Sequence, residues 1–112
     1  MRRQTRPRNG GGVMMLADAR GAAHAVFSWR IRHNLLGERV MSISDAVLGS
    51  LPGRALGDAL VEAILALAME RACDVIEYEI SEGQAGPRSE TLVARGFRRV
   101  GGDLLMARIS PD

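Results

Sequence analysis

Alternating apolar and polar positions predict strands in the first half of the chain. In the segment 22–33, AAHAVFSWRIRH, apolar side chains share one face while serine and arginines share the other. The apolar members are Ala25, Phe27, Trp29 and Ile31. The segment 38–48 alternates in the same way, with Met41, Ile43, Asp45 and Val47 on one side. An apolar run over 13–19 ends at a turn, Arg20-Gly21. We therefore expect three strands in an antiparallel meander.

The second half of the chain changes to a helical period. Apolar residues recur at helical spacing up to about Arg71, which predicts a helix packed against the sheet. They are Leu56, Leu60, Ala63, Ile64, Leu67 and Ala68. A strand over 74–80, a short helix over 88–95 and a closing hairpin over 97–100 and 104–109 follow. The predicted order is β-β-β-α-β-α-β-β, an α/β (α+β) fold with a largely antiparallel mixed sheet.

The first twelve residues, MRRQTRPRNGGG, show no apolar periodicity and end in three glycines. We expect residues 1–12 to be a disordered arginine-rich arm and 13–112 to be a single domain. All fifteen basic residues are arginine, and four of them lie in this segment, which has no acid. The remainder has eleven arginines against thirteen acids, so the basic balance belongs to the arm. The arm is either simply solvated or binds nucleic acid weakly.

Composition narrows the cellular context. No apolar run approaches the roughly 20 residues that span a bilayer, so no membrane association is expected. The single Cys73 cannot form an internal disulfide, which favours the cytoplasm. The use of arginine without lysine suggests a GC-rich bacterial gene. One cysteine and two distant histidines lack the spacing of zinc ligands, so we expect no metal.

Residues 52–64, PGRALGDALVEAI, form a glycine-bearing turn that leads into the long helix. The first N–H groups of a helix are free and its dipole favours negative charge, so such a turn can bind an anion. A glycine before a helix is nevertheless common as a purely structural turn.

The sequence around this turn favours a more specific interpretation of it as an anion site. The stretches VLGSLPGRALGDALVEAILALAMERACDVIEYEI and TLVARGFRRVGGDLLMARI, within residues 40–109, resemble the GNAT superfamily of acyl-CoA-dependent N-acyltransferases. In that family a strand ends at a turn Q/R-x-x-G-x-G/A, and a Gly-Phe pair, here Gly96-Phe97, opens the last strands. Residues 54–59 fit the turn literally. The helical stripe favours the register that puts Pro52, Ala55 and Gly57 at its fixed positions.

The resemblance implies that the chain transfers an acetyl group from acetyl-CoA to an amine by direct attack. The pyrophosphate would lie on the amides of the turn, with Asp58 pointing outward, and pantetheine would pair with the strand end at 45–49. A backbone N–H near Val47 would polarise the acyl carbonyl. The residues implied to bind the coenzyme are Val47, Leu48, Gly49, Gly53, Arg54, Ala55, Leu56, Gly57 and Asp58.

The same strand offers two carboxylates as general base, Asp45 and Glu38. Asp45 is preferred because its alternation places it on the face of Val47, although a solvated strand-end aspartate is equally consistent. The tyrosine that often serves as the family's general acid is replaced by Leu92. A catalytically inactive GNAT-like domain that binds CoA or a protein partner is therefore the alternative function.

The family usually begins with a strand and two helices that form much of the acceptor pocket. Here the arginine-rich arm occupies that place, so we expect those elements to be lacking and the chain to be shortened at its N-terminus. The uncovered sheet would then leave Phe27, Trp29 and Ile31 exposed. This reasoning predicts a homodimer, with the acceptor side open or completed by the second subunit.

Overall fold

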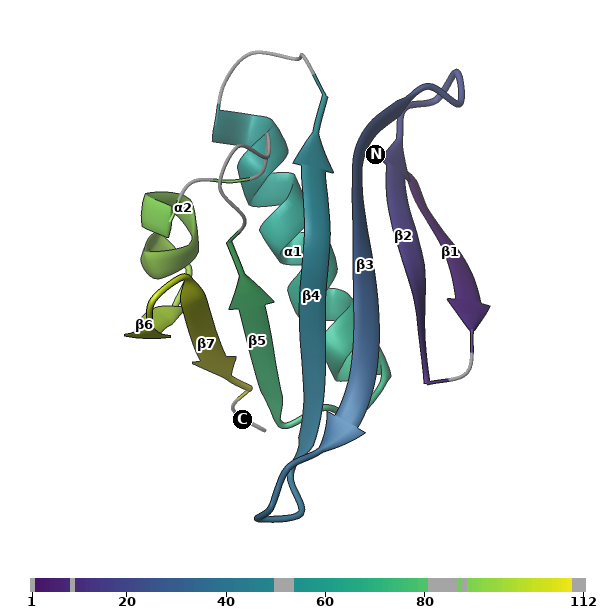
Figure 1. The fold of residues 1–112 in the computed structure, drawn as a ribbon. Coiled ribbons are helices and arrows are strands. Elements are labelled where there is room, and N and C mark those ends of the chain that lie inside the picture. Colours follow the sequence, from purple (N-terminus) through teal and green to yellow (C-terminus); the bar gives the residue numbers. More distant parts are fainter. Residues whose placement is uncertain (1, 9, 50–53, 81–86, 88, 110–112) are drawn as a thin grey trace.

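The computed structural model describes residues 2–8, 10–49, 54–80, 87 and 89–109. They form a seven-stranded sheet in the order β1-β2-β3-β4-β5-β7-β6, with two helices (Figure 1). The elements are β1 (Arg2–Arg8), β2 (Gly11–Ala17), β3 (Ala23–His33), β4 (Arg39–Leu48), α1 (Arg54–Glu70), β5 (Val75–Glu79), α2 (Ser89–Ala94), β6 (Arg98–Gly101) and β7 (Leu104–Arg108).

The sheet is mixed, with one parallel pair. Neighbouring strands are antiparallel except β4 and β5, which run in the same direction and are connected through α1. Two parallel strands need such a crossover because the chain has to return to the end of the sheet at which the first strand began. From β2 onward, the order and type of the elements agree with the sequence prediction.

The N-terminal segment differs from the prediction. Residues 2–8 form the edge strand β1 and not a disordered arm, so the expected loss of an N-terminal strand is wrong. β1 ends at Arg8 and β2 begins at Gly11, which leaves no room for helices between them. The glycines permit close packing: a Cβ on Gly12 would lie 2.5 Å from the carbonyl oxygen of Arg6.

Edge position explains why this strand lacks an apolar signal. Charged residues and proline are typical of edge strands because one row of backbone groups faces solvent. On the face of the strand that lies toward α1, the Arg3 guanidinium lies 2.7 Å from the Glu70 carboxylate at the end of that helix. The hydroxyl of Thr5 contacts the Met14 sulfur at 3.3 Å. These contacts hold β1 against β2 and α1.

One face of the sheet carries the hydrophobic core. α1 lies behind β4 and β5 in Figure 1, and its apolar stripe packs on the sheet. Phe27 and Trp29 are buried in this core, with exposed fractions of 0% and 4%, and Ile31 packs against it. The expectation that these three side chains need a second subunit is therefore wrong, because α1 covers them. Burying each large apolar side chain contributes about 1.5–3 kcal/mol.

A bulge in β4 changes which residues face this core. Val26 pairs with Val47 and Ser28 with Ser44, so β4 contains one residue more than β3 between these pairs. Asp45 has φ of 55°, a left-handed conformation, and is exposed. The core face continues through Ala46 and Leu48. The predicted alternation is wrong beyond Ile43, since Val47 lies on the opposite face.

Substitutions at Asp45 will test this conformation. Replacement by Gly should leave stability unchanged or raise it by up to about 1 kcal/mol, because glycine adopts positive φ without strain. Replacement by Val should lower the free energy of unfolding by about 1–2 kcal/mol. Urea unfolding of both variants and of Asp45→Asn measures this, and equal stability of Asp45→Val and the parent chain would contradict the bulge.

Candidate functional site

An opening in the sheet lies along the second half of β4. β4 pairs with β5 from Val40 to Ile43, opposite Val75 to Tyr78, and no pairing with β5 continues beyond Ile43. The five residues Ser44–Leu48 extend past this pairing, as the long β4 arrow in Figure 1 shows. Within the described ranges no strand pairs with that edge of the segment, so its backbone groups can pair with another extended chain.

The other edge of the same segment is fixed by β3. Val47 pairs with Val26, and the Gly49 N–H donates to the carbonyl oxygen of His24 at 2.6 Å. Backbone N–H groups alternate in direction along a strand. Because the N–H of Gly49 points toward β3, that of Leu48 points toward the opening. The side chain of Val47 is 40% exposed on the face away from α1.

The helix that follows begins beside this strand end. α1 starts at Arg54, and its first turn presents N–H groups without intrahelical partners. Gly53 and Pro52 lie outside the described residues, and so do the side chains of Arg54 and Ala55. The carboxylate of Asp58 lies 3.8 Å from Arg95, which agrees with the outward direction expected for it.

Two of the predicted coenzyme-binding residues belong to the packing of α1. Leu56 is buried in the core with 4% exposure, so only its backbone can meet a ligand. Gly57 is buried against α2, where a Cβ would lie 3.7 Å from Thr91 and 3.9 Å from Pro87. These are ordinary contact distances. A side chain at Gly57 would therefore point toward the second helix, and the predicted coenzyme contact of Gly57 would be made by its backbone N–H.

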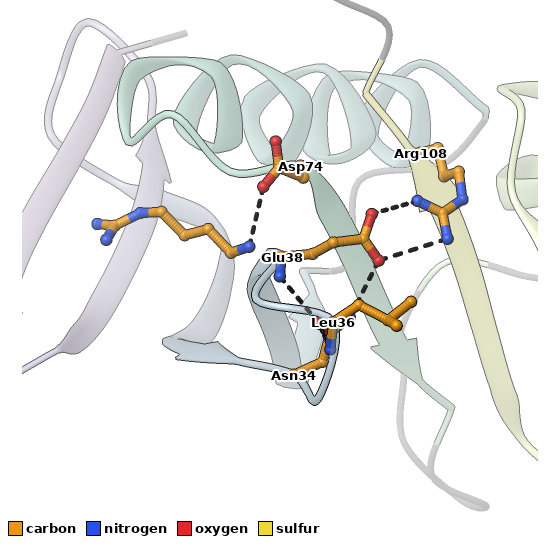
Figure 2. Close-up of polar contacts among 6 residues, drawn as sticks. Asn34, Leu36, Glu38, Asp74 and Arg108 are labelled. Carbon is orange, nitrogen blue, oxygen red and sulfur yellow. Dashed lines mark hydrogen bonds and ion pairs between the residues drawn. The ribbon is translucent and has the colours of Figure 1, made fainter.

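Glu38 lies at the opposite end of β4 from the opening. Figure 2 shows its carboxylate between the Arg108 guanidinium and the Asn34 side chain. The Arg108 guanidinium, with help from Asn34, lowers the pKa of Glu38. The Asp74 carboxylate accepts the N–H of Arg39 nearby at 2.9 Å. The structure thus assigns Glu38 to a polar network that closes this end of the sheet, and does not bring it to the candidate site.

Asp45, in contrast, lies within the free segment of β4 and is exposed. Leu92, at the position of the usual tyrosine, is fully buried in the core. Tyr78, the single tyrosine of the sequence, is also buried, and burial raises the pKa of its hydroxyl. Leu92 has no acidic proton, so the position of the usual tyrosine supplies no general acid.

Sequence reasoning did not identify a polar pair at the β2–β3 turn. His24 Nε2 is 2.8 Å from the Asp18 carboxylate, and the His24 backbone binds Gly49. Asp18 also accepts the N–H groups of Arg20 and Ala22, at 2.9 and 3.0 Å. The hydrogen bond from His24 and those of the turn lower the pKa of Asp18. The turn signal at Arg20-Gly21 was visible in the sequence, whereas the contact with Gly49 depends on strand pairing.

Within the described ranges, no group of three or more His, Cys, Asp or Glu residues could hold a metal ion. In the same part of the chain, neither helix is long and apolar enough to cross a membrane.

Solved structures with the same arrangement of strands and helices identify the fold. Tetrahymena GCN5 superposes with a TM-score of 0.69 and 11% identity, over 94% of this chain and 72% of that chain. A ribosomal-protein-alanine N-acetyltransferase from Brucella melitensis gives 0.66 and 19%, over 89% and 70%. A chain of the NatC complex bound to Gag peptide and CoA gives 0.69 and 14%, over 88% and 71%.

This chain has the GNAT fold. The predicted resemblance and fold class are confirmed at the level of the backbone. No protein-family model matches the sequence, and no curated protein matches it.

The pH dependence of stability will test the role of Glu38. A carboxylate whose pKa is lowered on folding stabilises the protein above its unfolded pKa, near 4.5 here, and this contribution is lost as pH falls through the lower folded value. We expect Glu38→Gln to reduce the urea midpoint at pH 7. Once the pH falls below the lowered folded pKa, Glu38 is protonated in both states, and the variant and the parent chain should converge. A constant difference between them across this range would contradict the ion pair with Arg108.

Proposed function

We propose that this chain binds an acyl-CoA, with acetyl-CoA as the donor, in the opening along β4 and transfers the acyl group to an amine. The observation that carries the proposal is the segment Ser44–Leu48, which extends past the described pairing with β5 and is followed in the chain by α1. The NatC chain, which shares the fold, was solved with CoA bound, and this supports the choice of ligand.

The residues present fit such a ligand. The amides of a pantetheine arm match the exposed backbone edge of β4 and would pair with it as an added strand. A pyrophosphate would then lie at the first turn of α1, where free N–H groups and the helix dipole favour an anion. Asp58 does not oppose this because its carboxylate lies toward Arg95.

The backbone also provides groups for the chemistry. The N–H of Leu48 faces the opening and would stabilise the negative charge that develops on the thioester oxygen. The amine nitrogen attacks the carbonyl carbon, the C–N bond forms, and the C–S bond breaks to release the CoA thiolate. An ordinary thiol has a pKa of about 8.5, so the thiolate can leave without a dedicated acid.

The proton of the attacking amine needs an acceptor, and Asp45 is the candidate from the predicted pair that lies by the opening. Its exposure lets it act directly or through one water molecule. The alternative function, a GNAT-like domain that binds CoA without catalysis, is favoured by the buried Leu92 at the tyrosine position. The homodimer, the bacterial origin and the cytoplasmic location stay predictions, and so does weak nucleic-acid binding.

Measurements of acetyl-CoA binding and of turnover distinguish acetyl transfer from CoA binding without catalysis. At 100 times the dissociation constant, acetyl-CoA should stabilise the chain by about 2.7 kcal/mol, measured by thermal unfolding. Thiol release with a panel of amines should fall by about 10²–10⁴-fold in Asp45→Asn, while its acetyl-CoA affinity stays unchanged. Asparagine tolerates the left-handed conformation, so the fold is preserved. No stabilisation at millimolar acetyl-CoA would exclude both acetyl transfer and CoA binding, and unchanged turnover in Asp45→Asn would exclude Asp45 as base.

Two glycines give a matched test of where the coenzyme lies. A Cβ on Gly49 would be 3.0 Å from the His24 carbonyl oxygen, so Gly49→Ala should displace the end of β4 and weaken acetyl-CoA binding several-fold. Gly57→Ala meets only ordinary contacts and should retain affinity, with a gain of up to about 1 kcal/mol in stability. Isothermal titration with acetyl-CoA measures both. Equal affinity in the two variants would argue against a site at the end of β4.

A further inference from the structure

The face of the sheet opposite α1 is the remaining route to the opening. The α1 side is filled by buried side chains such as Phe27, Ala46 and Leu56. In Figure 1, no described helix lies in front of β2, β3 and β4. A second substrate that reaches a thioester in the opening must therefore lie on this uncovered face.

The strand register shows which side chains lie on that face close to the opening. Met15, Val26 and Val47 are direct neighbours across β2, β3 and β4 and form one apolar row. The next row contains Val13, Ser28 and Ser44. Val47 and Val13 are 40% and 37% exposed, and the charged side chain of β4 next to these two rows is the exposed Asp45 at the bulge. An acceptor would accordingly place apolar groups next to its amine.

A cation lies further along the same face. Arg30 pairs with Ser42 in the next row, is exposed, and forms no ion pair among the described residues. Glu77, which pairs with Ser42 on the other side of this row, forms its ion pair with Arg32. From Val26 to Arg30 the strand advances four residues, about 13 Å. The acceptor should therefore carry an anionic group about this far from its apolar part.

We propose that the acceptor is the N-terminus of an extended peptide with apolar first residues and an acidic side chain about four residues along. This proposal rests on the proposed function. A face built from strands alone, without a covering helix in the described part, offers little concave surface for a small amine, whereas an extended chain can lie flat across it. Four extended residues match the distance between the apolar row and Arg30.

A charge-reversal experiment tests the proposal. The probes are two C-terminally amidated peptides, Ala-Val-Ser-Ser-Glu and Ala-Val-Ser-Ser-Lys, assayed by thiol release at saturating acetyl-CoA. The parent chain should show a kcat/KM about two- to fivefold higher for the acidic peptide, as expected for an exposed ion pair. Arg30→Glu should reverse this order, and Arg30→Gln should abolish it. Arg98→Glu, at an exposed position on β6 at the far edge, should leave the preference unchanged.

The outcomes distinguish a failure of the peptide proposal from a failure of the proposed function. If acetyl-CoA binds and a small amine is acetylated while neither peptide is, the peptide proposal is wrong and the proposed function stands. The same holds if both peptides react equally well, or if Arg30→Glu keeps the parent preference with an unchanged melting temperature. If acetyl-CoA fails to stabilise the chain, the proposed function itself is wrong, and the peptide proposal with it.

Discussion

The parting of β4 from β5 is the constraint on which the rest of the structure depends. β4 is held by β3 along its whole length but by β5 only up to Ile43. One inserted residue, Asp45, bends this free segment and shifts its register against β3. As a result Ala46 and Leu48 join the core, Val47 faces the uncovered side, and the N–H of Leu48 points into the opening. The bulge therefore decides which groups a ligand would meet.

The two ends of the sheet have opposite characters. At the closed end, Glu38 and Arg108 join the β3–β4 turn to β7, while Asp74 binds the start of β4 (Figure 2). At the open end, the polar contacts of Asp18 and His24 stay on the β2–β3 side and leave the β5 side of β4 free. Strands fixed at one end can diverge at the other without losing their register, because the pairing at the closed end sets it.

The sequence predicted the elements whose side chains have a regular period, namely the stripe of α1 and the strands from β2 onward. It did not predict the bulge, because one left-handed aspartate leaves no mark on a two-residue alternation, and so it placed Val47 on the wrong face. β1 was missed because an exposed edge strand needs no apolar residues. Glu38 was proposed from its place on the right strand, but position along a strand does not say which end carries the site. The family resemblance predicted the fold, whereas the faces of the individual side chains became known only from the strand register in the structure.

Amide hydrogen exchange with and without acetyl-CoA tests the account most directly. Binding in the opening predicts slower exchange for the amide of Leu48 and for those of the first turn of α1, with little change at the closed end around Glu38. The free protein should exchange the same amides rapidly, since no described strand covers that edge. Protection confined to other regions, or unchanged exchange at Leu48 under saturating acetyl-CoA, would contradict the account.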